Sequence, residues 1–323
     1  MQRRQASLGI LGLACSAANV LQAQEAYPSR VVKVVVPYSA GGGTDNVGRI
    51  LCEEFQRHLQ QSFVVDNRAG ANGRIGSDYV AKSAPDGYTL LLGGIGPFTI
   101  QPHLESVPYD PEKDFTPISF IGNADGVLLV HVDVPVQNVP ELLEYLRVKG
   151  DKVSYGSSGI GGGSHMAGEL FKSMAKVDMT HIPYKGDGAG LIDLMAGTVQ
   201  VMIPSLSAAM VSLKSGKVRV LGTTGVRRSS VMPDVKTIAE QGVIGYGADT
   251  WVAFYGPAGM TTRTVEVLNS TINKILADDP VRKKFLAQGI ATAPGSSEEL
   301  RRFTKTESEK WRRVIRERGL KAV

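Results

Sequence analysis

The sequence predicts an α/β fold of two lobes, each a mostly parallel sheet flanked by helices, with a ligand cleft between the lobes. Two observations support this prediction. Short apolar strands alternate with amphipathic helical patterns along most of the chain, which is typical of parallel sheets covered by helices. In addition, a triple glycine occurs twice after a strand, at residues 41–43 and 161–163, and each copy opens a helical pattern.

The two glycine loops share a longer pattern. Each triple glycine is followed by a hydroxyl residue, Thr44 or Ser164, and after three further positions by another glycine, Gly48 or Gly168. The backbone N–H groups of such a loop, together with the first turn of the helix, favour an anion. We therefore expect each lobe to offer one anion-binding loop to the same ligand.

The other elements follow from local patterns. Strands are indicated by β-branched or apolar runs, helices by apolar residues three or four positions apart, and turns by Gly, Pro and Asp. In the first part of the chain, the predicted elements are a strand ending at 36, a helix over 44–59, strands 63–65 and 88–92 around a helix at about 75–83, strands 118–121 and 127–132, and a helix beginning near Asn138.

The remaining elements are predicted in the same way. They are strand 153–155, a helix after the second glycine loop, strand 180–183, a helix ending at Met195, strand 199–203, helix 206–213, strands 218–222 and 251–256, and helices over 265–276 and 298–318.

These elements divide into a leader and two lobes. The close apolar runs at 118–121 and 127–132 interrupt the alternation, so we place the first crossing between lobes there. The expected boundaries are a secretory signal peptide at 1–26, a first lobe at 27–126 and 223–323, and a second lobe at 127–222. Facing loops at the carboxyl ends of strands imply a cleft that closes around its ligand by a hinge motion.

The N-terminus has the pattern of a secretory signal. Two arginines precede an apolar run from residue 8 to 20, and Ala23 or Ala26 ends the leader. The run is shorter than the roughly 20 residues that a membrane span needs. Lipidation at Cys15 is not expected, because Gly12 stands where a larger apolar residue is usual. The pattern therefore predicts an exported protein.

The composition excludes some partners. The chain has 323 residues and a formal net charge of +5. Its content of 42% hydrophobic and 21% charged residues is typical of a globular protein. Lys and Arg are spread along the chain rather than clustered with aromatic residues, which argues against nucleic acid. Without the leader, Cys52 is the one remaining cysteine. No intramolecular disulfide is then expected, and we interpret Cys52 as a buried, unreactive thiol.

The first glycine loop also approaches two nucleotide-binding signatures. Residues 43–48 have Walker A spacing, but Arg49 stands in place of the Lys that contacts phosphate. A dinucleotide fingerprint starting at Gly41 lacks its third glycine, because Asn46 occupies that position, although Asp66 follows the second strand as a ribose-binding acid would. A nucleotide-dependent enzyme is therefore an alternative class, less favoured than a binding protein.

Catalytic and metal-binding patterns are not found. Ser157 and Ser158 lack the spacing of a nucleophile elbow, and the five His residues do not stand at metal-ligand spacing. We interpret His165 and Glu169, four positions apart on one predicted helix, as a surface pair. No catalytic residue, metal or cofactor is predicted.

Some polar residues near the loops have both a structural and a ligand-binding interpretation. Asp45 and Ser164 are candidates to cap helices. Ser164 is also a possible donor to a carboxylate, whereas Asp45 would accept from an ammonium or hydroxyl group. Tyr38 and Tyr184 are either core rings or cleft walls that direct their OH groups inward. Lys185 is either solvated or a countercharge in the cleft.

The chain resembles the periplasmic solute receptors of tripartite tricarboxylate transporters, also called Bug receptors, over residues 28–323. The resemblance is specific because eight blocks occur in order. They are VVPYSAGGGTD (35–45), VDNRAGA (65–71), APDGYTL (84–90), PYDPEKDF (108–115), YGSSG (155–159), AGELFK (167–172), HIPYKG (181–186) and GPAG (256–259).

The resemblance implies a two-lobed fold of the periplasmic-binding-protein type II class. Such a receptor is a monomer that closes on one small dicarboxylate, tricarboxylate, acidic amino acid or aromatic acid and hands it to membrane permease subunits. In this family the carboxylate is held by main-chain and hydroxyl groups of the two glycine loops, partly through water. The ligand-binding residues implied here are Tyr38, Ala40, Gly41, Gly42, Thr44 and Asp45 in the first lobe, and Ser157, Ser158, Ser164, His165 and Tyr184 in the second.

The chain departs from the family pattern beside the expected cleft. Ala40 stands where the first loop often has Pro, Pro204 where relatives often carry Asp, and Val252-Ala253 where a Phe-Gly pair is common. These departures leave the identity of the ligand open. A sensory partner that presents its ligand to a membrane receptor would use the same cleft, and it stays as an alternative to uptake.

Overall fold

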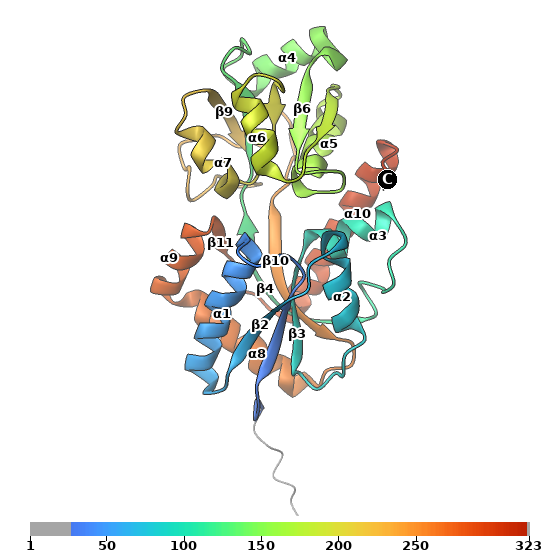
Figure 1. Ribbon diagram of the computed structural model, residues 1–323, viewed down its shortest axis with the longest axis vertical. Coiled ribbons are helices and arrows are strands. Elements are labelled where there is room, and N and C mark those ends of the chain that lie inside the picture. The colour runs from blue at the N-terminus through green and yellow to red at the C-terminus, as the bar shows by residue number, and fades with distance from the viewer. Residues whose placement is uncertain (1–26, 322–323) are drawn as a thin grey trace, which may run out of the picture.

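The computed structural model describes residues 27–321, which form two lobes stacked along the long axis of the molecule (Figure 1). The predicted signal peptide and Cys15 lie outside the described residues. Within the described part of the chain, no helix combines the length and the apolar character needed to cross a membrane.

The first lobe contains a six-stranded sheet in the order β11-β4-β10-β3-β1-β2. Its strands are β1 (Val32–Val36), β2 (Phe63–Asn67), β3 (Thr89–Gly94), β4 (Phe115–Ala124), β10 (Thr250–Pro257) and β11 (Ile290–Thr292). β1 is parallel to β2 and β3. β10 is antiparallel to β3 and β4, and β11 is antiparallel to β4.

Helices cover both faces of this sheet. They are α1 (Gly43–Leu59), α2 (Arg74–Ala81), α3 (Gln101–Leu104), α8 (Thr262–Ala277), α9 (Asp279–Ala287) and α10 (Ser297–Glu317), with the short turns η1 (Ala71–Gly73) and η2 (Gly96–Ile100). The β-branched run of β1 serves both faces, because side chains alternate along a strand. Val34 and Val36 pack in one buried cluster with α1 and α8, whereas Val35 belongs to the cluster that includes α10.

The second lobe contains a five-stranded sheet in the order β7-β6-β8-β5-β9. Its strands are β5 (Val127–His131), β6 (Ser154–Ser157), β7 (Thr180–Pro183), β8 (Val201–Met202) and β9 (Val218–Thr223). Its helices are α4 (Val139–Lys149), α5 (Gly163–Ala175), α6 (Asp187–Met195) and α7 (Leu206–Leu213), with the turns η3 (Gly150–Lys152) and η4 (Ala239–Gln241).

The α/β class and the two-lobed arrangement are confirmed, but the sheets are mixed rather than mostly parallel. β6 is parallel to β7 and β8, whereas β5 is antiparallel to β8 and β9. The reason lies in the crossings between the lobes. The chain leaves the first lobe along β4 and returns along β10, and these two strands are antiparallel neighbours in the first sheet.

The boundary expected from the sequence places residues 223–249 in the first lobe, but the connection after β9 is hydrogen-bonded to the second lobe. The N–H of Ile238 donates to the carbonyl of Thr223 at 2.9 Å, and the hydroxyl of Tyr246 donates to the carbonyl of Ala167 at 3.0 Å. We therefore propose to place the second crossing near Asp249, immediately before β10.

Helix α10 extends from the first lobe to the second (Figure 1). Its first half packs against β4 and η2, and its second half contacts α5. At its end, Arg318 Nε donates to Glu169 Oε2 of α5 at 3.0 Å. Further back, Lys310 Nζ donates to the carbonyl of Gly247 at 3.0 Å. A helix that begins on one lobe therefore ends in ionic contact with the other.

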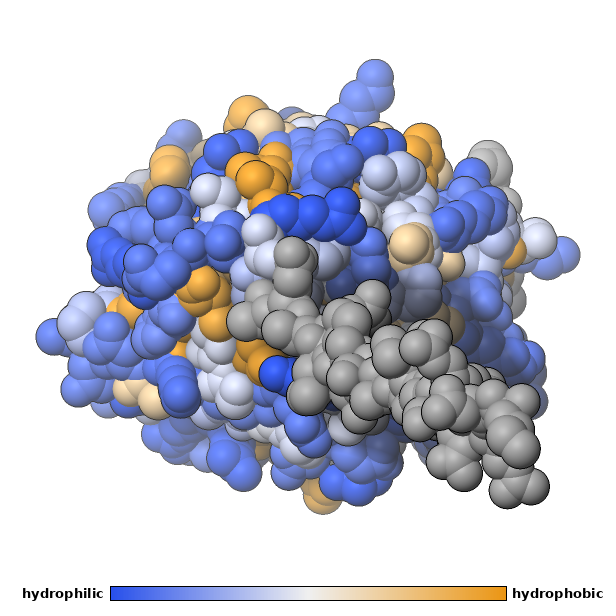
Figure 2. All heavy atoms as spheres, turned by 90° about the horizontal axis from the view of Figure 1, so that it is seen from below, coloured by the Kyte–Doolittle hydropathy of each residue, from blue (hydrophilic) through white to orange (hydrophobic). Residues whose placement is uncertain are grey.

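Figure 2 shows the molecule from its first-lobe end. Where grey atoms do not cover it, this face is mostly hydrophilic, with small and separate hydrophobic areas. Single exposed apolar side chains of this kind are normal for a globular protein.

Candidate functional site

A cavity of about 320 Å³ lies between the two lobes. Both glycine loops line it, through Gly43 and Thr44 of the first loop and through Gly161, Gly162 and Gly163 of the second. The other lining residues are Tyr38, Asn72, Gly94, Ile95, Gly96, Ile100, Ala124, Ser205, Ser207, Thr250, Trp251, Val252, Gln288 and Ile290. The pairing of the two loops, which the sequence predicts, is thus observed in the structure.

The lining combines polar and apolar residues but carries no ionised side chain, because none of its residues is an Asp, a Glu, a Lys, an Arg or a His. Helices α1 and α5 begin at the two loops, and their N-cap residues, Gly42 and Gly162, have no side chain with which to bond the N–H groups of the first turn. Those N–H groups and the positive ends of both helix dipoles are therefore available to an anion.

In the first loop, the side chain of Asp45 hydrogen-bonds to the backbone and lies outside the cavity lining. Its carboxylate accepts from the N–H of Gly41 at 2.8 Å, from Arg49 Nε at 2.9 Å and from Asn67 Nδ2 at 3.0 Å. Burial raises the pKa of Asp45, but the hydrogen bonds from Arg49, Gly41 and Asn67 outweigh it and leave the pKa below its usual value. Asp45 is 1% exposed and is fully engaged within its own lobe.

In the second loop, His165 takes the equivalent place. Its Nδ1 accepts from the N–H of Gly161 at 3.1 Å, so the ring is neutral with its proton on Nε2. Burial, with a smaller contribution from His181, lowers the pKa of His165 to about 4. Ser164 supports the same loop, because its Oγ accepts from the N–H of Ser158 at 2.7 Å and donates to Asp187 Oδ1 at 2.8 Å.

A buried polar chain connects this loop to α10. The His165 ring stacks on His181, with centroids 4.2 Å apart, and His181 stacks in turn on Tyr155, with centroids 4.9 Å apart. The Tyr155 hydroxyl donates to Glu169, which also accepts from Arg318. The interpretation of His165 and Glu169 as a surface pair is therefore wrong. Each is 3% exposed, because α5 turns both side chains into the second lobe.

The structure separates the expected ligand residues into three groups. Tyr38 and Thr44 line the cavity. Ala40, Gly41 and Gly42 are exposed on the first loop beside it. The remaining residues hydrogen-bond to other parts of the protein and lie outside the lining; they are Asp45, Ser157, Ser158, Ser164, His165 and Tyr184.

Two of these residues bond away from the cavity. Ser157 Oγ is 2.6 Å from His181 Nε2, and the Tyr184 hydroxyl donates to Asp193 Oδ2 at 2.7 Å. Lys185 is exposed and does not line the cavity. The helix caps also differ from expectation, because Gly42 and Gly162, not Asp45 and Ser164, are the N-cap residues.

Most of the other lining residues are not among those predicted from the sequence, and Asn72 and Gln288 are two of them. Asn72 lies in a run of four positive φ values, in which Ala71 has φ 45° and Asn72 has φ 50°. The Gly-Ala-Asn-Gly sequence signals such a turn, and strained backbone of this kind gathers at binding sites. Gln288 follows α9, and its Oε1 accepts from Asn46 Nδ2 at 2.9 Å. Its amide N–H groups donate to none of the described residues and are available to a ligand.

Within the described residues, no cluster of three His, Cys, Asp or Glu side chains is arranged to hold a metal ion. Cys52 is buried in the first lobe, and burial raises the pKa of its thiol to about 12. A thiol with this pKa is a poor nucleophile at neutral pH.

Comparison with known proteins gives a consistent result. Residues 47–320 match the family model described as the tripartite tricarboxylate transporter family receptor. Protein BugT of Bordetella pertussis is 33% identical over 318 residues, which cover 97% of this chain and 98% of BugT.

Two solved structures are similar over nearly the whole chain. Rpa4515 of R. palustris, solved with adipate, has a TM-score of 0.80 and 35% identity and covers 92% of this chain and 100% of its own. MatC of Rhodopseudomonas palustris, solved with bound malate, has a TM-score of 0.75 and 30% identity and covers 90% of this chain and 100% of its own.

Proposed function

Because the chain belongs to the family of tripartite tricarboxylate transporter receptors, we propose that it is a periplasmic receptor that captures a small organic carboxylate between its lobes and delivers it to a membrane transporter. The observation that supports this proposal most directly is the pair of N–H-rich loops on one uncharged cavity. Fixed amide dipoles neutralise a carboxylate without a buried countercharge, which is costly to desolvate when no ligand is present.

The arrangement suits a ligand with two carboxylates. One loop opens α1, of 17 residues, and the other opens α5, of 13 residues, so each lobe offers a separate positive helix terminus. Adipate and malate, bound by the two similar structures, are both dicarboxylates. Hydroxyl and amide groups of Thr44, Asn72 and Gln288 line the space between and suit hydrogen bonds that set the orientation of the ligand.

We also propose that the ligand leaves chemically unchanged. General acid–base catalysis needs a group that titrates near the working pH. Tyr38 is the titratable side chain of the lining, and burial raises its pKa to about 12. The imidazole of His165 and the carboxylate of Asp45 are both occupied by backbone N–H groups behind the loops.

Isothermal titration with adipate and malate tests the proposal, with ATP and NAD as probes of the nucleotide alternative. The matched variants are Gly43→Leu, which places a side chain at the cavity, and Gly188→Leu on α6. A Cβ at either glycine meets no atom within 4 Å, so both variants are expected to fold.

We expect binding of at least one dicarboxylate at a 1:1 ratio, more than about tenfold weaker in Gly43→Leu and unchanged in Gly188→Leu. Tight binding of ATP or NAD with no binding of any carboxylate would reject the receptor function. Delivery is tested separately, by uptake of labelled ligand into cells with and without the chain. Binding without any effect on uptake would favour the sensory alternative.

A further inference from the structure

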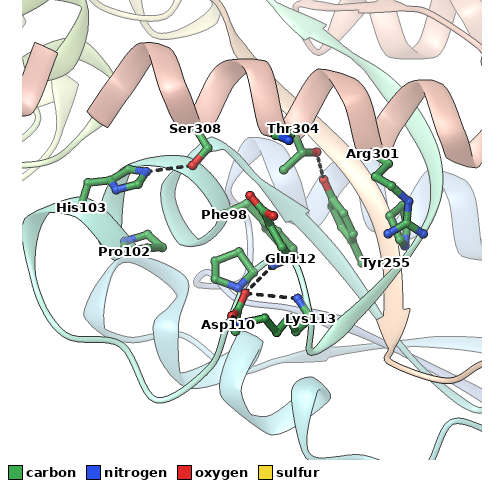
Figure 3. Close-up of a pocket in the computed structure, with 13 residues that line it drawn as sticks. Phe98, Pro102, His103, Asp110, Glu112, Lys113, Tyr255, Arg301, Thr304 and Ser308 are labelled. Carbon is green, nitrogen blue, oxygen red and sulfur yellow. Dashed lines mark hydrogen bonds and ion pairs between the residues drawn. The ribbon is translucent and has the colours of Figure 1, made fainter. Parts of the chain in front are cut away.

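A second cavity, of about 460 Å³, lies in the first lobe away from the cleft, between α10 and the loop that precedes β4 (Figure 3). One wall is a stripe on α10, formed by Arg301, Thr304, Lys305 and Ser308. The opposite wall is residues 110–113 of the loop. These loop residues belong to the PYDPEKDF block, so one of the eight blocks that carry the family resemblance lies at this cavity and not in the cleft.

Hydrogen bonds within residues 110–114 stabilise the conformation of the loop wall. Asp110 Oδ1 accepts from the N–H of Glu112 at 2.9 Å and from the N–H of Lys113 at 3.2 Å, and Asp114 Oδ2 accepts from the N–H of Asp110 at 2.7 Å. Asp110 also pairs with Lys113 Nζ at 2.9 Å. These bonds engage every charged group of the turn except Glu112, whose side chain extends from the loop toward α10 in Figure 3.

The floor of the cavity is apolar and rigid. Phe98 and Tyr255 stack with ring centroids 3.9 Å apart and planes inclined by 16°. The Tyr255 hydroxyl is fixed by Thr304 Oγ1 at 2.7 Å, and one end of the cavity is closed by His103 Nε2 and Ser308 Oγ, 2.8 Å apart. Three proline rings complete the apolar walls: Pro102, Pro111 and Pro117.

The mouth of the cavity carries unpaired charges of opposite sign on opposite walls. Glu112 and Lys305 are both exposed, and neither has an ion-pair partner within 4.0 Å among the described residues. Arg301, which lies beside Lys305 on α10, forms an ion pair with Glu298, with Nε 3.4 Å from Oε2. An occupant that meets both walls therefore needs a cationic group for Glu112 and an anionic group for Lys305, above an apolar body for the floor.

We propose that this cavity is a second binding site, for a zwitterion with an apolar body, of the chemical class of a hydrophobic α-amino acid. The ammonium group pairs with Glu112, the carboxylate with Lys305 and Arg301, and the side chain packs on the prolines and on the Phe98–Tyr255 pair. The cavity volume falls in the range of small-molecule sites, roughly 300–1,000 Å³. The site shares no lining residue with the cleft and does not depend on the function proposed for the cleft.

The test is titration of the ¹⁵N-labelled full chain with L-phenylalanine, in the presence and absence of saturating adipate, followed by amide NMR. We expect saturable shifts at Lys113, Thr304 and Ser308 that adipate does not change, with the amides of residues 161–163 unmoved. Phenylpropanoate lacks the ammonium group and phenethylamine lacks the carboxylate. Each is expected to bind about tenfold more weakly than L-phenylalanine.

Variants assign the charges. Glu112→Gln and Lys305→Gln are each expected to weaken L-phenylalanine binding about tenfold. The matched controls are Glu309→Gln and Lys214→Gln, which replace exposed charges outside the cavity. Both should leave the affinity for L-phenylalanine unchanged. Absence of saturable shifts at millimolar L-phenylalanine, shifts confined to the glycine loops, or equal binding of all three probes would each overturn the proposal. Shifts of the glycine loops by adipate report on the cleft separately.

Discussion

Asp45 and His165 hold equivalent positions in the two lobes. Each lies two residues after the last glycine of its triple, and each accepts a hydrogen bond from the N–H of the first glycine, Gly41 at 2.8 Å or Gly161 at 3.1 Å. Both glycines have positive φ values, +82° and +74°, which side chains disfavour. One loop is therefore anchored by an anion and the other by a neutral ring, although the backbone of the two loops is alike.

Replacement of Asp45 tests the first anchor. Asp45→Asn brings an amide N–H group against Arg49 or Asn67 and leaves a buried donor unsatisfied. We therefore expect the free energy of unfolding, measured by urea denaturation, to fall by about 1–3 kcal/mol. Asp279→Asn, an exposed carboxylate on α9, is the control. Because the folded pKa of Asp45 is below its unfolded value, the stabilisation is present above the unfolded pKa and is lost as pH falls through the folded pKa. An unchanged unfolding midpoint would contradict this role.

The second anchor predicts a pH dependence. The pKa of His165 is about 4 in the folded protein and 6.5 for the free side chain. The unfolded chain therefore binds the proton first as the pH falls below 6.5, and stability is lost down to about pH 4. The full effect is of the order of 3 kcal/mol. His165→Asn keeps an acceptor near the Nδ1 position and should reduce the slope of stability against pH between 6.5 and 4. An identical slope in the variant would show that other groups cause it.

The contact between α10 and the second lobe predicts a large effect of a conservative change. Glu169 is 3% exposed and accepts from Tyr155, Lys172 and Arg318. Glu169→Gln removes the charge that pairs both cations, and Asp178 retains a bond to each of them. We expect a loss of about 2–3 kcal/mol, below the usual cost of a broken buried pair. Exposed Glu298 provides the matched control, Glu298→Gln, which should change the urea midpoint little.

Gly48 of α1 and Gly168 of α5, the glycines that follow the two loops at the same spacing, predict a graded series of stability losses on replacement by Ala. A Cβ at Gly168 would lie 2.5 Å from Tyr155 Cε2, and one at Gly48 would lie 3.1 Å from Val36 Cγ2. Gly168→Ala should therefore destabilise the protein by about 1–3 kcal/mol, and Gly48→Ala by less. Gly188→Ala meets no atom within 4 Å and should be neutral or stabilising, because Ala favours a helix. Equal melting temperatures for all three would argue against close helix–strand packing.

Much of the fold was predictable because local signals and tertiary packing agree. The β-branched run of β1, the apolar spacing of α1 and the triple glycines each specify one element and its end. Antiparallel pairing was not predictable from alternation, since it follows from β4 and β10 passing between lobes. Helix α9 and strand β11 were also missed, because α9 has nine residues of which four are charged, and β11 has only three residues.

The cavity between the two glycine loops was predictable from the sequence, but most of the side chains that line it were not. Thr44 and Tyr38 line the cavity, whereas Asp45 and His165, which the resemblance also implies as ligand-binding residues, bond to the backbone of the loops and lie outside the lining. Spacing along a helix places a residue near a loop. It does not reveal whether the side chain faces the cavity or bonds to the loop on the other side. Gln288 was missed because it reaches the cavity from 242 positions beyond its partner Asn46.

The central claim is that the two glycine loops bind the same carboxylate ligand. Amide NMR of the full chain during titration with adipate tests it most directly, by comparing the shifts of Gly43 and Thr44 with those of residues 161–163. We predict that both sets of amides shift with one dissociation constant and saturate at one adipate per chain. Shifts in one loop alone, or two sets that saturate at different adipate concentrations, would contradict it.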